Sequence, residues 1–211
     1  MNKFIEYFWT FILGSFIGFL SETIWCIIRW KKLESRRGLI YGYFIPIYGI
    51  ATLLISLIID IFNIENYFLF FITTFLICAL VEYISSFLQE KCFETKSWDY
   101  SNMIGNLNGR INLLYLLLWS ILGVLWCEYY RIIIDFIFLI FNRFNLLNIV
   151  TLITFIFMTY NCYISIVASY RQKLRRNGIG PKNRYEVWLD NKYSDERLLK
   201  VYANAKVVVK E

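Results

Sequence analysis

Two glutamates lie inside long apolar stretches, where an ionised carboxylate costs at least a few kcal/mol unless it is paired or hydrated. Glu22 lies seven residues before Arg29, and Glu82 lies about six residues before the end of its own apolar stretch. At 1.5 Å of helical rise per residue, both carboxylates lie about 10 Å inside the same boundary. Two carboxylates at one depth could hold a proton or a cation. The alternative is that each pairs with Arg37, Arg110 or a tyrosine hydroxyl and locks a helical bundle.

The remaining composition excludes most other chemistry. The chain has no histidine, so it cannot form a Ser-His-Asp triad or a HExxH zinc site. Its five cysteines contain no CxxC pair and are typical of small apolar core residues. We therefore expect no catalytic residue, no metal site and no cofactor. An intramembrane enzyme that uses the two carboxylates ranks third, because no nucleophile accompanies them.

The elements that carry these glutamates are expected to be membrane spans. Of 211 residues, 58% are hydrophobic and 18% are charged, which is too apolar for a soluble domain. Five stretches reach the length of about 20 residues that a crossing needs. They are Phe4 to Ile28, Leu39 to Phe62, Tyr67 to Leu88, Ile111 to about Ile132, and Ile149 to Tyr170. The sequence predicts an all-α integral membrane protein with a bundle of five transmembrane helices.

Lysine and arginine in the loops predict the orientation, because they favour the cytoplasmic side. The first and third loops are rich in them and the second, residues 63–66, has none. This pattern predicts a plasma-membrane protein with its N-terminus outside and its tail in the cytoplasm. The apolar segment Asp135 to Phe144 is too short to span, so we expect an interfacial or re-entrant piece there. A sixth span is the alternative.

The charge divides the chain into two regions. Residues 1–170 carry 11 basic and 11 acidic residues, whereas residues 171–211 carry 11 and 5. We predict a polytopic transmembrane domain over 1–170 and a basic cytoplasmic tail over 171–211, beside anionic lipid. Within the tail, the sequence favours a short helix from Ser194 to Ala205 with Ser194 as its cap.

The second predicted span contains a proline, at which the helix should kink or break. Pro46 removes a backbone donor, and Gly49 loosens the next turn. Backbone groups freed there would face the level of both glutamates, as in the broken helices that line cavities in many membrane proteins. We expect a cavity or polar layer formed by Glu22, Arg37, Pro46, Tyr48, Glu82 and Asn161, with Tyr115 and Trp119 near that level.

Small residues on the first span suggest close helix packing. Gly14 and Gly18 form a GxxxG stripe on the same helical face as Glu22. This stripe could join two copies of the chain in a homodimer or serve packing within one chain.

The third loop is unusually rich in aromatic, acidic, amide and glycine residues. It could simply order the start of the fourth span, or it could be a docking surface on the cytoplasmic side. The residues predicted for docking are Glu90, Trp98, Asp99, Tyr100, Asn106, Gly109 and Arg110.

Several of these pieces occur together in the CmpB-like family of putative ABC-transporter type IV permeases, small bacterial membrane proteins that the chain resembles. The resemblance covers roughly residues 14–126. Its pieces are Gly18 to Glu22, Arg36 to Gly38, Gly42, Pro46 to Gly49, Glu82 to Ser86, Glu90 with Lys91, Trp98 to Ser101, Asn106 to Ile111, and Trp119. Tyr43 stands where the family often has proline, and Ser97 with Trp98 replaces a tryptophan pair. The resemblance implies transport and supplies no catalytic residues.

Two functions follow from these patterns. The first is a permease-like transmembrane subunit of an ABC-type transporter, of unknown substrate. The chain has no GxxxxGK[ST] loop, so such a subunit would need a separate ATP-binding cassette partner. The alternative is a non-transporting scaffold or regulator that binds a partner through its loops and tail. Neither function involves nucleic acid, and in both the lipid bilayer surrounds the helices.

Overall fold

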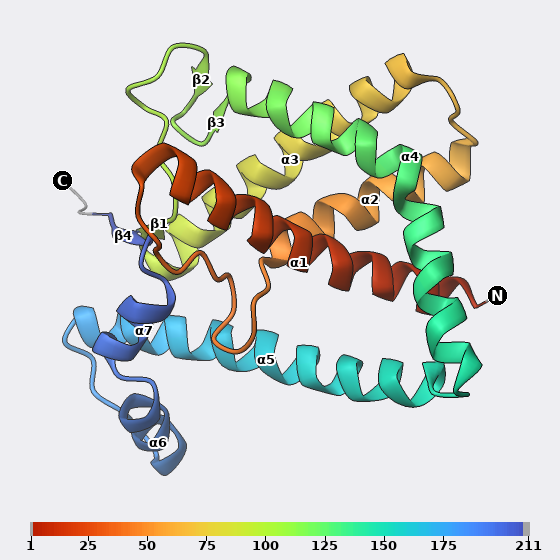
Figure 1. Cartoon of the computed structure of the whole chain (residues 1–211). Helices are drawn as coiled ribbons and strands as arrows, with labels where there is room; N and C mark the ends of the chain where they lie inside the picture. The colour runs from red at the N-terminus through yellow and green to blue at the C-terminus, as the bar shows by residue number, and fades with distance from the viewer. Residues whose placement is uncertain (1, 209–211) are drawn as a thin grey trace.

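The computed structural model describes residues 2–208, which are mostly helical (Figure 1). The helices are α1 (Lys3–Trp30), α2 (Pro46–Phe62), α3 (Tyr67–Phe93), α4 (Leu113–Arg143), α5 (Leu147–Arg176), α6 (Arg184–Lys192) and α7 (Asp195–Val201). Short strands β1 (Thr95–Lys96) and β4 (Lys206–Val207) pair antiparallel, as do β2 (Asn106–Leu107) and β3 (Ile111–Asn112). In this described part, α1, α3 and α5 are long and apolar enough to cross a membrane, and α2 is a shorter apolar helix. The predicted helical membrane class is confirmed, whereas five crossings stay a prediction.

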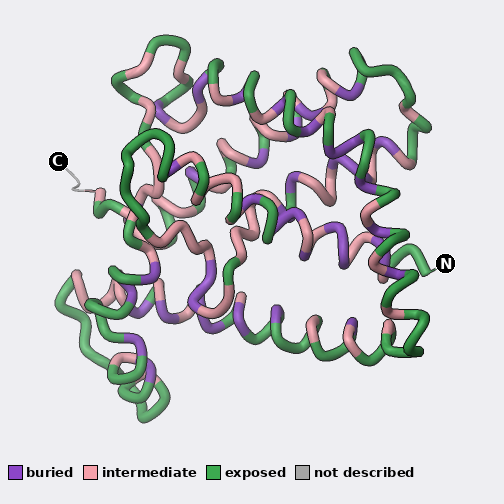
Figure 2. The backbone as a smooth tube through the Cα atoms, viewed as in Figure 1, coloured by how far each residue is buried: buried purple, intermediate pink, exposed green. Residues whose placement is uncertain are grey.

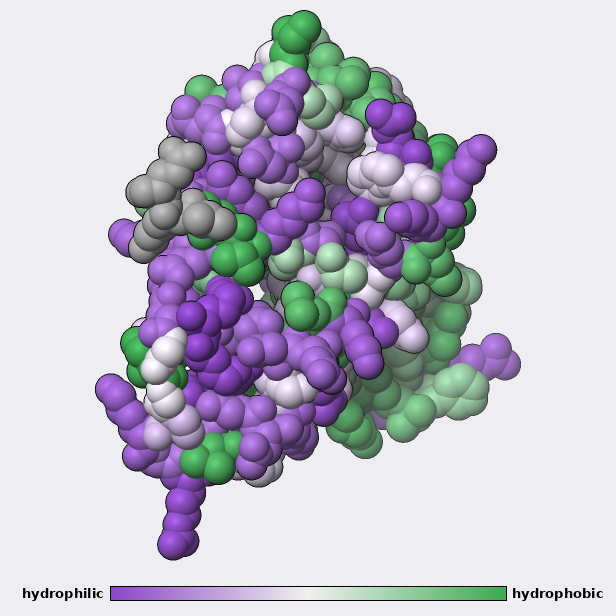
Figure 3. Space-filling model, turned by 90° about the vertical axis from the view of Figure 1, so that its left-hand side faces the viewer, coloured by the Kyte–Doolittle hydropathy of each residue, from purple (hydrophilic) through white to green (hydrophobic). Residues whose placement is uncertain are grey.

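The connecting segments are sorted to the two ends of the long helices. The loops that follow α1 and α3, together with α6 and α7, gather at one end, on the left of Figure 1. We call it the tail end. The N-terminus, residues 63–66 and the turn between α4 and α5 lie at the opposite end. Hydrophilic residues cover most of the tail-end face, and hydrophobic ones gather along its flank (Figure 3).

Asparagine side chains start several of these helices by accepting from free backbone amides. Asn66 Oδ1 accepts from the Phe68 amide at 2.8 Å, and Asn112 Oδ1 accepts from the Leu114 amide at 3.1 Å. Polar residues thus fix where apolar helices begin, and Asn66 does so for α3, the helix that carries Glu82.

The second predicted span begins later than the sequence suggested. Residues 38–45 are not helical, and Pro46 is the first residue of α2, where its missing amide is no loss. The expected span from Leu39 is therefore wrong at its start, and the predicted break is an irregular segment before the helix. Its backbone is satisfied inside the protein, since the Ile45 amide donates to Ser15 O at 2.9 Å and the Ile40 amide donates to Ser165 Oγ at 3.0 Å.

The apolar segment predicted to be interfacial belongs to α4, which runs without interruption to Arg143. Figure 1 shows the later part of α4 turning across the bundle rather than along it. Its Ile134 and Phe138 pack with Trp9 of α1 and Met158 of α5. The described chain thus has no separate sixth helix between α4 and α5.

The helices bury their facing sides, as Figure 2 shows along the backbone. The small-residue stripe of α1 faces α2 of the same chain. A Cβ added at Gly18 would lie 2.3 Å from the Tyr48 ring, and one at Gly14 would lie 1.9 Å from Thr52 Oγ1. Of the two alternatives, packing within one chain is the one that the structure shows at these glycines, and a homodimer stays a prediction.

The tail is folded onto the end of α5. Helix α5 extends to Arg176, past the predicted domain boundary at residue 170. The predicted cap is confirmed for α7, where Ser194 Oγ accepts from the Arg197 amide at 3.4 Å. Leu189 of α6 and Leu198 of α7 are buried in a cluster with Ile164 and Ala168 of α5.

Candidate functional site

Glu22 of α1 lies against α2 at the tail-end half of the bundle. Tyr48 Oη donates to Glu22 Oε1 at 2.6 Å, a short hydrogen bond typical of a charged acceptor. Gly18, one helical turn earlier on α1, leaves the space that the Tyr48 ring fills. The glycine stripe therefore positions the tyrosine that holds the carboxylate.

Glu82 of α3 is held from the other side, by the loop that follows α3. Tyr100 Oη donates to Glu82 Oε1 at 3.1 Å. The second oxygen, Oε2, is buried and has no hydrogen-bond partner within residues 2–208. The tyrosines that hold Glu22 and Glu82 contact Trp119 and Tyr115, which lie one helical turn apart on α4. The structure thus brings together the two acids that the sequence placed at one depth.

Aromatic rings enclose this pair. The Tyr48 ring meets Trp119 of α4 edge to face at 5.1 Å between centroids, and Tyr100 stacks on Tyr115 at 5.1 Å. Trp25 of α1 meets Tyr115 at 6.0 Å. Tyr115 and Trp119 were expected near this level, whereas nothing in the pattern pointed to Trp25. We call the group of Glu22, Tyr48, Glu82, Tyr100, Tyr115 and Trp119 the carboxylate cluster.

The expected arginine partners of the two glutamates lie elsewhere. Arg110 pairs with Glu90 at 2.8 Å and donates to Ser86 Oγ at 3.2 Å. Arg37 lies over the Tyr43 ring, 5.1 Å from its centroid. No ion pair reaches Glu22 or Glu82 from any residue between 2 and 208. The alternative in which Arg37 or Arg110 neutralises them is wrong, and the tyrosine hydroxyl is the partner that both glutamates use.

Asn161 of α5 does not join the carboxylate cluster. Its side chain holds the backbone of the irregular segment, donating to Tyr41 O at 2.6 Å and accepting from the Tyr41 amide at 3.1 Å. The side-chain amide of Asn161 thus satisfies the backbone N–H and C=O of Tyr41, as a neighbouring β-strand would. Non-helical backbone at membrane depth is tolerated only when it is satisfied in this way.

The predicted docking loop is a compact hairpin tied to α3. Trp98 Nε1 donates to Arg110 O at 2.8 Å, and the Gly109 amide donates to Asn106 Oδ1 at 2.9 Å. Gly109 adopts a φ of +67°, and a Cβ there would lie 2.3 Å from Ser101 Oγ. The hairpin is thus held together by its own hydrogen bonds, and Tyr100 and Arg110 connect it to the helix that carries Glu82.

Two titratable groups of this loop are shifted. Burial, and then the charge of Glu82, raise the pKa of the Tyr100 hydroxyl well above its usual value. The pKa of Asp99 is lowered, chiefly because the Ser101 hydroxyl donates to its carboxylate at 2.5 Å. Tyr100 therefore stays a hydrogen-bond donor to Glu82, and Asp99 stays ionised at the protein surface.

A third acid within the apolar helices was not singled out by the sequence. Asp60, near the end of α2, accepts hydrogen bonds from Tyr7 at 3.0 Å, from Tyr130, and from Arg131 at 2.6 Å. Lys3 adds an ion pair at 3.3 Å. Its partners come from α1 and α4, so only the tertiary structure reveals that this acid is neutralised while Glu22 and Glu82 are not.

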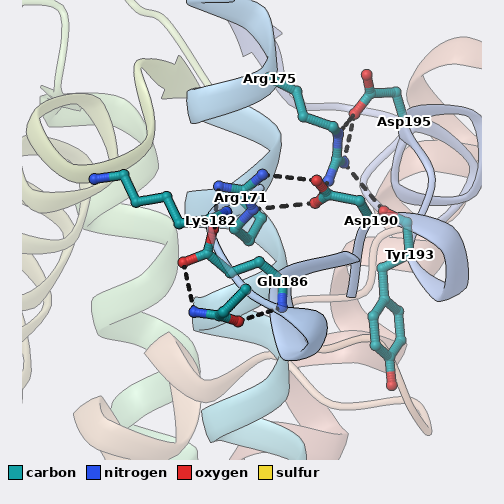
Figure 4. A network of polar contacts seen from close by, with 8 residues as sticks. Arg171, Arg175, Lys182, Glu186, Asp190, Tyr193 and Asp195 are labelled. Atoms are coloured by element: carbon teal, nitrogen blue, oxygen red, sulfur yellow. Dashed lines mark hydrogen bonds and ion pairs between the residues drawn. The ribbon is translucent and has the colours of Figure 1, made fainter. Parts of the chain in front are cut away.

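An ion-pair network at the tail end holds α6 and α7 (Figure 4). The buried Arg171 pairs with Glu186 at 3.1 Å and with Asp190 at 2.6 Å, while Arg175 pairs with Asp190 and with Asp195. Hydrogen bonds from Arg171, and then from Arg175, lower the pKa of Asp190. We call these residues the arginine network.

The fold and these clusters define a polytopic helical membrane protein with a polar tail end. The chain matches the family described as putative ABC-transporter type IV over residues 9–166. It belongs to this family, as the resemblance had implied. No curated protein and no solved structure matches it.

Proposed function

We propose that the protein is the permease-like transmembrane subunit of an ABC-type transporter, with its tail end in the cytoplasm. The family assignment supports a role in transport. The basic loops at the tail end support the orientation, because lysine and arginine favour the cytoplasmic side. We further propose that α1 to α5 each cross the membrane, so that the N-terminus lies outside.

The observation that carries this proposal is the pair of glutamates without a cation. A buried carboxylate that serves packing alone is normally neutralised, as Asp60 is by Lys3 and Arg131. Glu22 and Glu82 have only tyrosine donors, and Glu82 Oε2 has none within the described chain. An acid kept in this state inside a membrane protein is best explained by a proton or a cation that it binds during transport.

The hairpin at residues 94–112 would couple this cluster to a partner. Ile104 is fully exposed at the hairpin, while Tyr100, four residues earlier, donates to Glu82. Movement of the hairpin would therefore alter the hydrogen bonding of a membrane carboxylate. The chain has no GxxxxGK[ST] phosphate-binding loop, so ATP would be bound by a separate ATP-binding cassette subunit. That subunit would dock on this surface.

Partner capture tests this function directly. The full-length tagged chain should be crosslinked in its native membrane and purified, and the retained proteins should be identified by mass spectrometry. We expect an ATP-binding cassette ATPase, lost in Ile104→Arg and kept in the control Glu65→Arg at the opposite end. Recovery of a partner without ATPase motifs would overturn the transporter function and favour the scaffold. Recovery of no partner would also count against it.

Labelling tests the orientation separately. A cysteine at position 65 should react with an impermeant maleimide added outside intact cells, and a cysteine at position 108 should react only after lysis. The reverse pattern would overturn the proposed topology. Labelling of the parent chain measures the background from its five native cysteines, of which Cys92 alone is exposed in the structure.

A further inference from the structure

Helix α6 lies beside α5 rather than projecting away from the membrane. Figure 1 shows it along the outer side of the tail end of α5, away from α1. Tyr185 Oη donates to Tyr163 Oη at 3.3 Å. Tyr163 precedes Arg171, the first charged residue of α5, by eight residues, or about 12 Å of helical rise. The Tyr185 hydroxyl therefore lies about two helical turns on the apolar side of Arg171.

The inner face of α6 fixes its rotation. Leu189 is fully buried in a cluster with Ile164 and Ala168 of α5. Glu186 and Asp190, on the same helical face, bind Arg171 (Figure 4). Both acids of α6 are thus directed toward α5, and they are neutralised there.

The outer face of α6 is aromatic and basic. Tyr185 and Trp188 stack with centroids 5.8 Å apart, and each leaves more than 40% of its surface exposed, as does Val187. Lys192 lies 4.7 Å over the Trp188 ring. Tyrosine and tryptophan are enriched where a membrane meets water, since one side of each ring system is apolar and the other is polar.

Several basic residues that the sequence predicts to lie beside anionic lipid instead bind other groups of the protein. Arg171 and Arg175 belong to the arginine network, Lys173 binds Lys91 O at 3.2 Å, and Arg176 donates to Phe93 O. In contrast, Lys182, Arg184 and Lys192 form no ion pair within residues 2–208. Three positive charges left for an outside partner therefore lie on or next to α6, beside its exposed aromatic rings.

We propose that α6 is an interfacial helix that binds the headgroups of anionic lipid. Tyr185, Val187 and Trp188 lie in the interface, and Lys182, Arg184 and Lys192 contact the phosphates. The arginine network holds the helix in this position by neutralising the acids that would otherwise repel such lipids. This inference needs α5 to cross a membrane but does not depend on transport.

Lipid titration of the purified full-length chain tests the charge requirement. A fluorescent phosphatidylglycerol and a matching phosphatidylcholine should be titrated into the protein in detergent. Each basic residue near an anionic surface contributes about fivefold, so Arg184→Gln with Lys192→Gln should weaken phosphatidylglycerol binding about 25-fold. The control, Lys200→Gln with Lys206→Gln, removes the same charge elsewhere in the tail and should leave binding unchanged. Equal losses in both variants would overturn the proposal.

Spin labels in nanodiscs test the position of the helix. A nitroxide at position 187 should collide more with oxygen, which partitions into lipid, than with a water-soluble nickel chelate. A nitroxide at position 200 on α7, a matched exposed position, should show the opposite preference. A water-exposed label at position 187 would overturn the interfacial placement even if anionic lipid binds.

Discussion

The arginine network and the carboxylate cluster are both built on long apolar helices, but the charges of the network form ion pairs and those of the cluster do not. Arg171, with 3% of its side chain exposed, faces two acids. Glu22 and Glu82 accept hydrogen bonds from tyrosine hydroxyls. A neutralised charge stabilises the contact that it makes, whereas a carboxylate left without a cation stays available to a proton or a cation. The comparison separates charges that are paired within the fold from carboxylates that have no cation within residues 2–208.

The largest expected effect on stability comes from removing Arg171, the buried cation of the arginine network. Arg171→Met leaves Glu186 and Asp190 without their main partner, so we expect a loss of about 2 to 3 kcal/mol in the stability of the tail contact. Thermal unfolding in detergent should begin earlier, and protease should cut within residues 177–183 more readily. Lys200→Met, at an exposed position of α7, is the control. Equal stability of the two variants would mean that the network contributes little.

A steric change should disturb the carboxylate cluster without altering its charge. In Gly18→Ala, the new methyl group would lie 2.3 Å from the Tyr48 ring and push it away from Glu22. Overpacking of this kind costs about 1 to 3 kcal/mol. The melting temperature should fall, while Gly180→Ala, where no atom lies within 4 Å, should melt like the parent. A parent-like Gly18→Ala would contradict the close packing of α1 on α2.

Removing one hydroxyl should have a smaller effect. Tyr100→Phe takes away the only described donor to Glu82, and we expect a loss of about 1 kcal/mol. Tyr170→Phe, on an exposed part of α5, serves as the control in the same melting assay. If the transport proposal is correct, Tyr100→Phe should also reduce stimulation of the partner ATPase while its binding is kept.

Removing the charge of Glu22 or Glu82 should not lower stability, in contrast to the removal of Arg171. Glu82→Gln keeps an oxygen that can accept from Tyr100 and removes a charge that has no cation, so stability should be unchanged or rise by less than about 1 kcal/mol. The same holds for Glu22→Gln with Tyr48. A clear drop in melting temperature would mean that a cation does neutralise the pair. A stable double variant with full transport activity would refute the role of the cluster in transport.

Acid should affect the arginine network only at low pH. The pKa of Asp190 is lowered in the folded protein from its usual 3.8, so its contribution is present above 3.8 and is lost as pH falls through the lower, folded value. We expect the tail to stay docked at pH 5 and to loosen below about pH 4, as measured by hydrogen exchange of α6 and α7. If α6 and α7 already exchanged faster at pH 6, protonation of Asp190 would not be the cause.

Part of the candidate site could be read from local spacing. Helical rise placed Glu22 and Glu82 at one depth, and the position of Pro46 predicted irregular backbone close to residues 38–45, the non-helical segment that precedes α2. The partners could not be predicted in this way. Tyr100 reaches Glu82 only because a hairpin folds back on α3, and Arg110 pairs with Glu90 instead. Spacing along one helix defines a face and a depth, but it does not select which loop residue meets that face.

The sequence by itself determined the class of this protein, because the length of an apolar stretch is a local property that needs no knowledge of the fold. It also determined which end is basic. Only the tertiary structure decided which charges are neutralised, since ion pairs and hydrogen bonds join residues far apart in the chain. The basic residues after Tyr170 illustrate this difference. The sequence offered them to lipid, whereas the fold uses Arg171 and Arg175 to hold α6 and leaves Arg184 and Lys192 of α6 without an ion pair in the described part of the chain.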